Sequence, residues 1–260
     1  FDDTSIIPSN IVFASIKDAG YSVALTGDGA DELFCGYSSF GNLSKIEKIL
    51  DKKFDFIRRH PGKLMKKIFS NYKSYDLDRL FMNESDLLID LSCNGFKVRE
   101  WVEDIETEYD PLHYLNKILK DLGGLRPLDK LRILNLNFKL PQQMLFKVDR
   151  ASMFNSVEAR PLFLNNKIIE AALSVSSSVM MQEGQKTVLK KIYQSQIPHS
   201  GWSLPKTGFG WKTNSYKDIF SNLSNSCLKK QTGIDGFNLL KKRKMHHKRG
   251  HFGLLSLVSW

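Results

Sequence analysis

The chain has 260 residues, of which 42% are hydrophobic, and this composition suits a globular protein of one or two domains with a sizeable core. No apolar run approaches the ~18 residues that cross a bilayer, and the first residues resemble no leader peptide, so a membrane protein is disfavoured and a cytoplasmic location is expected. Three widely spaced cysteines exclude a disulfide framework and a zinc cluster, and they favour reduced thiols.

The formal net charge is +10, and much of it comes from one short stretch near the C-terminus. Such a run is typical of a solvated segment, with binding to nucleic acid or another polyanion as the alternative. No aromatic residue interleaves with the run, so base stacking is not indicated and nucleic acid is not the expected partner. The basic residues of the run are Lys241, Lys242, Arg243, Lys244, Lys248 and Arg249.

The first part of the chain predicts a helix followed by a strand. Ser9 is expected to cap a helix that runs through Ile11 to Asp18 and ends at Gly20. Residues 21–26 (YSVALT) then form a short, mostly apolar segment of the kind found in the buried parallel sheet of an α/β protein.

An acidic glycine turn at residues 27–32 (GDGADE) follows the strand and precedes a predicted helix at residues 33–37. Glycines let the backbone approach a ligand and a helix start offers free amides to an anion, which favours a phosphate or nucleotide. Asp28, Asp31 and Glu32 would repel phosphates unless Mg²⁺, held by one or two carboxylates, lies between them. The alternative is that these acids only complement the helix dipole, and the residues alone leave both interpretations open. No GK(S/T) follows the glycines, so the turn is not a Walker A loop.

The rest of the chain is expected to be largely helical, although residues 40–120 give only weak patterns. Apolar stripes at helical spacing are expected to face the core rather than a ligand. Three such stripes are Leu131, Leu134 and Phe138, in a helix expected to end before Pro141; Ile168, Ile169, Ala172 and Leu173; and Val188, Leu189, Ile192 and Tyr193.

The strand and turn together carry a long motif. Residues 25–37 (LTGDGADELFCGY) resemble the asparagine synthetase signature L-(S/T)-G-(D/E)-G-(G/A/S/C)-D-E-x-F-G-G-Y at twelve of thirteen positions, with Cys35 in place of a glycine. This length is far more specific than an isolated pair of glycines.

The resemblance implies a role for each residue of the turn. Thr26 and Gly27 are expected to contact ATP, and Asp28 to lie beside the reacting acyl group, where the family acid assists aminolysis. Asp31 is the implied Mg²⁺ ligand, and Glu32 is expected close to the substrate.

A second block at residues 147–160 resembles the family pattern K-x-D-R-x-S-M-x-x-S-x-E-x-R. Its charged side chains can pair bidentately, which favours a buried ion-pair cluster joining helices over a direct catalytic role. Those side chains are Asp149, Arg150, Glu158 and Arg160. The next segment, PLFLN at residues 161–165, departs from the family's x-P-F-L-D because Asn165 replaces the acid, so the salt bridge made there in the family is not expected.

A third block, GQKTVLKK at residues 184–191, is similar to the family's G-x-x-K-x-x-L-R-x. Lys186 matches the lysine that neutralises charge on the adenylate, and a cation placed where charge develops stabilises a transition state. An exposed helix lysine is the alternative, since most lysines are exposed. PKTGFG at residues 205–210 matches a late family turn, P-K-x-G-F-G.

Taken together, the blocks imply an α/β fold and an activity. The fold is a partial Rossmann-like, adenine-nucleotide-hydrolase parallel sheet ending within residues 1–45, followed by a mainly helical portion at 46–260. The implied reaction uses ATP and Mg²⁺ to convert aspartate to asparagine through β-aspartyl-AMP, with glutamine or ammonia as nitrogen donor. The alternatives are a related amidotransferase or cyclising synthetase acting on another carboxylic acid, and a non-catalytic binding remnant.

Two parts of the family enzyme have no counterpart in the sequence. The pyrophosphate loop S-G-G-x-D-S is missing, since Gly123-Gly124 has neither the serine before it nor D-S after it, and so is the glutaminase domain. We therefore expect a fragment that is a poor catalyst alone and is completed by a missing N-terminal portion or a partner chain, because half a phosphate cradle loses most of its preorganised charge stabilisation.

Overall fold

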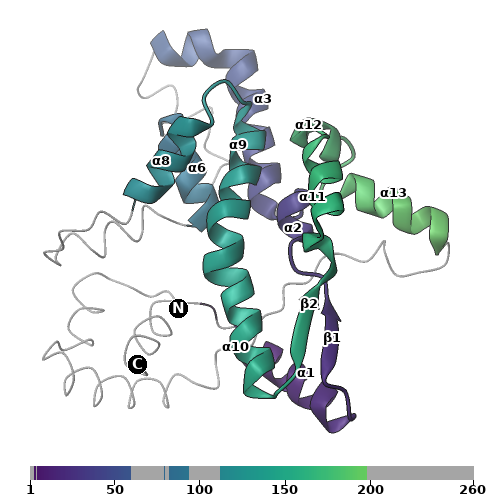
Figure 1. Ribbon diagram of the computed structural model, residues 1–260. Coiled ribbons are helices and arrows are strands. Elements are labelled where there is room, and N and C mark those ends of the chain that lie inside the picture. The colour runs from purple at the N-terminus through teal and green to yellow at the C-terminus, as the bar shows by residue number, and fades with distance from the viewer. Residues whose placement is uncertain (1–2, 4, 60–78, 80–81, 94–111, 198–260) are drawn as a thin grey trace, which may run out of the picture. The chain divides into compact units, whose positions relative to one another are not determined.

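A computed structural model describes two compact units of the chain, which are interleaved in sequence (Figure 1). Within the described residues the protein is α/β, mostly helical, with a small parallel sheet of two strands. The described residues are 3, 5–59, 79, 82–93 and 112–197, so the basic run near the C-terminus and the predicted turn at 205–210 lie outside them. None of the helices in this part of the chain is long and apolar enough to cross a membrane. The boundary expected after residue 45 stays a prediction. Unit 1 comprises Phe1–Thr26, Gln143–Arg160 and Leu204–Trp260, and unit 2 comprises Gly27–Gln142 and Pro161–Ser203.

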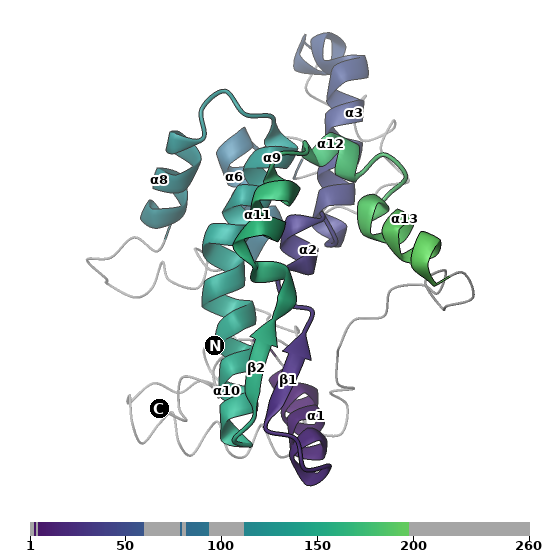
Figure 2. The same ribbon diagram turned by 45° about the vertical axis from the view of Figure 1, so that its right-hand side comes forward.

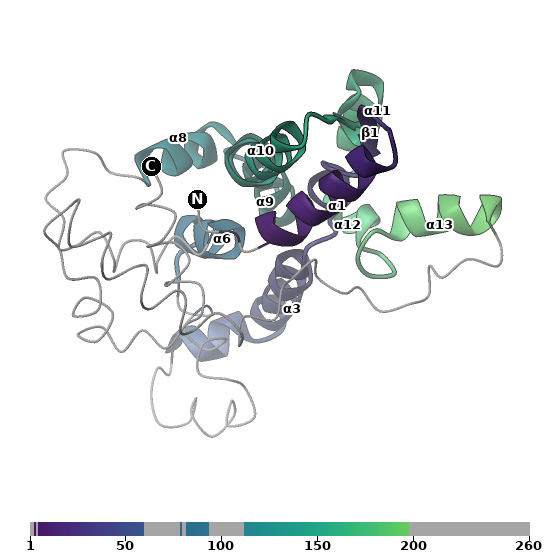
Figure 3. The ribbon, with the colours of Figure 1, turned by 90° about the horizontal axis from the view of Figure 1, so that it is seen from below.

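Unit 1 contains two helices and the two strands in its described part. Helix α1 packs along α10 (Figure 3), and β1 runs parallel to β2 (Figure 2). A small core of Phe13, Ala151 and Val157 joins the helices to the strands. The elements are α1 (Ile6–Asp18), β1 (Val23–Thr26), α10 (Phe146–Phe154) and β2 (Glu158–Pro161), whose last residue lies at the unit border.

Helix α1 begins earlier than the sequence indicates. Ser5 occupies the N-cap position, and Asp3 Oδ1 accepts hydrogen bonds from the Ser5 amide at 2.9 Å and the Ser5 hydroxyl at 2.6 Å. Ser9 lies inside the helix and donates its hydroxyl to the Ser5 carbonyl at 2.8 Å, so the predicted cap at Ser9 is wrong. Pro8 is compatible with the longer helix because its missing N–H falls in the first turn. The predicted end is confirmed, with Gly20 at φ 85°.

Unit 2 is a helical assembly around α9, which packs against α3, α6, α8 and α12. Its core includes Phe40, Leu88, Leu115, Leu131 and Leu134, each at most 1% exposed. The elements are α2 (Ala30–Leu33), α3 (Ser38–Arg59), α6 (Glu84–Cys93), α8 (His113–Asp121), α9 (Pro127–Leu134), the 3₁₀ helix η2 (Leu162–Leu164), α11 (Asn166–Leu173), α12 (Ser177–Met180) and α13 (Thr187–Gln196).

The chain leaves α9 through a π helix, η1 (Asn135–Leu145), which leads directly into α10. Pro141 lies inside η1, so the predicted helix end before Pro141 is wrong. Inside an α-helix a proline removes one hydrogen bond and crowds the preceding turn, and here the helical path through Pro141 has π rather than α geometry. The π helix also carries Lys139.

The other predicted stripes are confirmed only in part. Ala172 is buried, whereas Leu173, Ile192 and Tyr193 are 45%, 55% and 44% exposed. Asn165, which stands where the family pattern has an acid, caps α11 by accepting a hydrogen bond from the Lys167 amide at 3.0 Å. A neutral amide therefore performs a local structural task at this position.

Candidate functional site

The acidic turn at residues 27–32 forms the start of unit 2, and its second glycine, Gly29, has an unusual backbone conformation. Gly29 has φ 88°, a conformation that favours glycine, and a Cβ at this position would overlap the Leu164 side chain of η2. Helix α2 starts at Ala30, inside the acidic segment, and ends after one turn at Leu33. The turn is therefore held against η2 by a close backbone approach that no larger residue permits.

The predicted helix at residues 33–37 is wrong, because the chain turns sharply there. Cys35 has φ 54°, in the left-handed region where the family signature has glycine, and the Gly36 amide donates to the Asp31 carbonyl at 2.7 Å. The Cys35 side chain is fully buried, and burial raises the pKa of its thiol to about 11, partly offset by Ser177 and Arg132. Cys35 is thus a neutral packing residue at neutral pH.

Asp31 and Lys186 form an ion pair at the centre of the site. Lys186 Nζ lies 2.7 Å from Asp31 Oδ1, and the two side chains are 29% and 28% exposed. Gly36 provides the space for this pair, since a Cβ there would overlap Asp31 Oδ1 and Lys186 Cε. Lys186 itself has φ 57° and immediately precedes α13. The sequence assigned these two residues to different tasks, and the structure brings them into contact.

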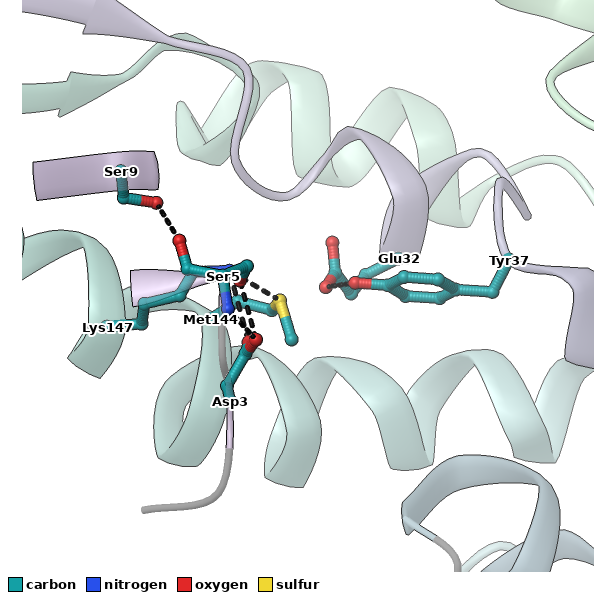
Figure 4. A network of polar contacts seen from close by, with 7 residues as sticks. All are labelled: Asp3, Ser5, Ser9, Glu32, Tyr37, Met144 and Lys147. Atoms are coloured by element: carbon teal, nitrogen blue, oxygen red, sulfur yellow. Dashed lines mark hydrogen bonds and ion pairs between the residues drawn. The ribbon is translucent and has the colours of Figure 1, made fainter. Parts of the chain in front are cut away.

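Glu32 lies beside this pair but points into the protein. It is 2% exposed, and the Tyr37 hydroxyl donates to its Oε1 at 2.6 Å, as Figure 4 shows. Lys139 Nζ lies 4.1 Å from the centroid of the Tyr37 ring. Neither Tyr37 nor Lys139 was assigned a role from sequence: Tyr37 ends the signature, and Lys139 lies in no motif.

The electrostatics of the site are dominated by burial and clustered carboxylates. Burial raises the pKa of Glu32, opposed by the Tyr37 hydrogen bond and the positive charge of Lys139. Burial also raises the pKa of Tyr37, and the carboxylates of Glu32, Asp31 and Asp28 raise it further. The three acids of the turn therefore share one neighbourhood, which two lysines approach.

The remaining predicted residues lie at the start of the turn. Thr26 is the last residue of β1, and its hydroxyl is buried without a hydrogen-bond partner among the described residues. Gly27 is exposed with open space at its Cβ position, and Asp28 is half-buried. Their roles, and that of Asp31 toward Mg²⁺, stay predictions: in the described segments no three His, Cys, Asp or Glu side chains are grouped to hold a metal.

In unit 1, the second block supplies a partly buried cation, Lys147, in place of the expected buried cluster. Lys147 is 12% exposed, pairs with Asp3 Oδ2 at 3.2 Å and donates to the Ser5 hydroxyl at 2.9 Å and the Met144 sulfur at 3.7 Å (Figure 4). It ties the start of α1 to α10.

The predicted buried cluster of this block is wrong. Glu158 and Arg160 pair with each other along β2 at 2.9 Å and 3.2 Å, but their side chains are 56% and 60% exposed. Asp149 and Arg150 are also exposed, and Arg150 lies 4.9 Å from the Phe146 ring centroid. Residues two apart on a strand face the same side, so this pair forms locally and joins no helices.

Comparisons with known proteins agree with the motifs. A family model described as asparagine synthase matches residues 1–248. The putative asparagine synthetases (glutamine-hydrolyzing) of Mycobacterium tuberculosis and Mycobacterium bovis are each 25% identical to this chain over 195 residues, covering 72% of the chain and 29% of those proteins. Asparagine synthetase (glutamine-hydrolyzing) 1 of Bacillus subtilis is 24% identical over 246 residues, covering 86% of the chain and 37% of that protein. The chain thus spans 29% to 37% of the length of these relatives. No solved structure matches it.

Proposed function

This chain belongs to the asparagine synthase family, and from that premise we propose that it acts in the ATP-dependent conversion of aspartate to asparagine. In the proposed reaction the side-chain carboxylate of aspartate attacks the α-phosphorus of ATP, which gives β-aspartyl-AMP and releases pyrophosphate. Ammonia, supplied by glutamine or free in solution, then attacks the acyl carbon, and AMP leaves as asparagine forms.

The contact between Asp31 and Lys186 carries this proposal. A carboxylate suited to a hard cation and an ammonium suited to a phosphate or an adenylate lie 2.7 Å apart, both partly open to solvent. Adenylation needs this combination because charge moves from the attacking carboxylate to the leaving pyrophosphate, and fixed charges placed along that path stabilise the transition state. Their partial exposure leaves both groups within reach of a bound ligand.

The residues present fit ATP and Mg²⁺. Carboxylate oxygens of Asp31 and Asp28 are hard donors of the kind Mg²⁺ prefers, and Mg²⁺ commonly takes one or two carboxylates and completes its shell with phosphate oxygens and water. The buried hydroxyl of Thr26, which has no partner among the described residues, and the open backbone at Gly27 are compatible with contact to a nucleotide. Bound Mg²⁺ would neutralise phosphate charge beside these acids.

Two residues of the chain would then have separate roles in the reaction. We propose that Lys186 stabilises negative charge on the adenylate and that Asp28 orients the attacking ammonia or accepts its proton. The parallel pair β1–β2 supports a proposed relationship to Rossmann-like nucleotide-binding sheets, in which ligands bind beyond the carboxyl ends of the strands. The acidic turn directly follows such an end, that of β1.

The test is ATP–pyrophosphate exchange, because exchange reports adenylation without the nitrogen donor. The protein is the polypeptide encoded by the whole reading frame that contains this chain, assayed with aspartate and Mg²⁺. We expect exchange with aspartate, and we expect Asp31→Asn and Lys186→Ala to lower it about 100-fold or more, as expected when a preorganised charge is removed. Lys190→Ala is the matched control, since Lys190 is an exposed lysine in the first turn of α13, the helix that Lys186 precedes.

The outcomes separate the alternatives. Exchange with another carboxylic acid but not with aspartate would replace asparagine synthesis by a related amide-forming reaction. A protein that binds ATP but exchanges with no acid would be a binding protein, and the proposal would fail. Equal losses in the Lys190 control and in Lys186→Ala would show that the Asp31–Lys186 contact has no special part.

A further inference from the structure

Lys139 belongs to no motif in the sequence, yet it reaches the last residue of the acidic signature. It lies on the π helix η1, half-buried, with Nζ 4.1 Å from the Tyr37 ring centroid. A cation over an aromatic face is attracted by the ring quadrupole, more strongly when water is partly excluded. π-helical turns are often found at functional sites, and Lys139 lies within one.

Tyr37 links Lys139 to the acidic turn, because it contacts both Lys139 and Glu32. Its hydroxyl donates to Glu32 Oε1 at 2.6 Å, which closes residues 32–37 into a short loop. Glu32 is 2% exposed, so the hydrogen bond from Tyr37 satisfies a polar group that water cannot reach. Without Lys139, the Tyr37 ring would lose the cation above its face.

The closed loop contains the backbone against which the Asp31–Lys186 pair lies. Gly36 is within it, and the space beside Gly36 is too small for a Cβ because Asp31 Oδ1 and Lys186 Cε occupy it. The Gly36 amide also donates to the Asp31 carbonyl at 2.7 Å. A shift of the loop by less than the size of a methyl group would therefore disturb the ion pair.

We propose that Lys139 is a positioning residue of the ligase site, which acts through Tyr37 and Glu32 to fix the loop that holds Asp31 against Lys186. This inference rests on the proposed function for its kinetic consequence, but its structural consequence is independent of any activity. Lys139 touches no substrate in this scheme. It limits the freedom of the loop, so its removal lowers turnover more than substrate binding.

The experiment uses four single variants of the whole-reading-frame protein and one double variant. Lys139→Met removes the charge at similar length, and Lys139→Arg keeps a cation that can stack on the ring. Tyr37→Phe keeps the ring and removes the donor to Glu32. Lys117→Met, at an exposed lysine of α8 in the same unit, is the matched control. The double variant combines Lys139→Met with Tyr37→Phe.

The first readout is hydrogen exchange of the amides in residues 30–37, which reports local opening. We expect Lys139→Met and Tyr37→Phe to speed exchange there about fivefold to tenfold, as expected when a partly desolvated cation–π contact or a buried hydrogen bond is lost. Exchange in α8 should stay unchanged, Lys139→Arg should restore protection, and the double variant should be no worse than the worse single variant. Lys117→Met should match the wild type.

The second readout is ATP–pyrophosphate exchange kinetics. We expect Lys139→Met to lower kcat about tenfold with KM for aspartate within about twofold, and Lys139→Arg to restore kcat. Unchanged protection of residues 30–37 in Lys139→Met overturns the inference, and so does faster exchange across the whole protein or failure of Lys139→Arg to restore protection. Absence of adenylation in the wild type would count against the proposed function alone, because the hydrogen-exchange result still decides the role of Lys139.

Discussion

At the scale of single residues, Gly36 is the position of the signature whose lack of a side chain makes room for the Asp31–Lys186 ion pair. We expect Gly36→Ala to push Lys186 away from Asp31, because the new Cβ would occupy the place of both side chains. Unfolding free energy should fall by about 1–3 kcal/mol, the usual cost of overpacking, and adenylation should be lost with it. Urea denaturation and pyrophosphate exchange measure the two effects.

Gly41→Ala is the control for this prediction. Gly41 lies in α3 with nothing near its Cβ position, so alanine should raise stability by about 0.5–1 kcal/mol through helix propensity and leave adenylation intact. If Gly36→Ala keeps wild-type stability and activity, the close approach at Gly36 is not needed for the site.

Glu32 gives the protein a pH-dependent contribution to stability. Its pKa is raised in the folded state by burial, so the folded protein binds more protons than the unfolded chain between the usual glutamate pKa and the raised value. The contribution is fully present below the usual glutamate range and is lost as pH rises through the raised pKa. Relative to Glu32→Gln, the wild type should therefore lose unfolding free energy with rising pH, at up to about 1.4 kcal/mol per pH unit between those two pKa values.

The difference in unfolding free energy between the wild type and Glu32→Gln is measured by urea denaturation from about pH 4, near the usual pKa of glutamate, to about pH 8. Glu170→Gln, at an exposed glutamate of α11, should show no such trend. If the wild type instead gains unfolding free energy relative to Glu32→Gln as pH rises, the pKa of Glu32 is not raised by folding.

The sequence named the residues of the candidate site but could not predict their contacts. Asp31 and Lys186 were each named by a motif, and their pairing could not be read from spacing because the chain between them folds as several separate helices. Glu32 was expected near the substrate from its place in the signature, and only the fold shows that its carboxylate points to Tyr37. Lys139 has no local pattern that would indicate its role.

At the scale of elements, a buried arginine holds the end of one helix against another. Arg132 of α9 is 2% exposed and donates to the Val175 carbonyl at 2.7 Å and to the Ala172 carbonyl. These carbonyls lie at and just beyond the C-terminus of α11, where the Ala172 carbonyl also accepts a hydrogen bond from the Val175 amide at 3.2 Å. The positive charge of the same arginine lowers the pKa of the Cys35 thiol. Arg132 of α9 therefore also lies near the sharp turn that contains Cys35.

We expect Arg132→Met to lower the unfolding free energy by about 1–3 kcal/mol, because the partly buried Val175 carbonyl would lose this donor. Arg132→Lys should recover little, because an ammonium lacks the fork that serves two carbonyls at once. Urea denaturation measures both variants, with Arg126→Met at an exposed arginine as the control. An Arg132→Lys variant as stable as the wild type would show that charge alone, without the fork, holds α11.

Element prediction succeeded where the pattern is local and failed where the tertiary context decides. The end of α1 at Gly20 and the buried face of α9 follow from their sequences. The π helix through Pro141 does not, since proline ordinarily predicts an end. Strand β2 was not expected at all, because its four residues, EARP, carry two charges and a proline and resemble no strand.

At the scale of the molecule, unit 1 is assembled from segments that lie far apart in the chain. Its described elements come from the first 26 residues and from residues 143–160, with the whole described part of unit 2 up to α9 between them. The parallel pairing of β1 with β2 and the packing of α1 on α10 are both long-range, and neither leaves a trace in local sequence. The class of the fold was therefore predictable from the first strand and the helical remainder, while its assembly was not.

The ion pair of Lys147 with Asp3 is one of the polar contacts that join these two segments, beside the hydrogen bond from Asn155 to the Asn10 carbonyl at 3.4 Å. Lys147 and Asp3 are 12% and 15% exposed, so removing the cation leaves a partly buried carboxylate that keeps its hydrogen bonds from Ser5 but loses its positive partner. We expect Lys147→Met to cost about 1–3 kcal/mol of unfolding free energy, between the values usual for exposed and for buried ion pairs.

The loss should be concentrated in unit 1. Amide hydrogen exchange in α1 should speed up in Lys147→Met while exchange in α9 keeps its wild-type rate, because the broken contact joins the start of α1 to α10 and touches neither end of α9. Lys167→Met, at an exposed lysine of α11, should change neither helix. If hydrogen exchange speeds up equally in α1 and α9 in Lys147→Met, the two units unfold as one cooperative body. The ion pair then does not stabilise unit 1 separately.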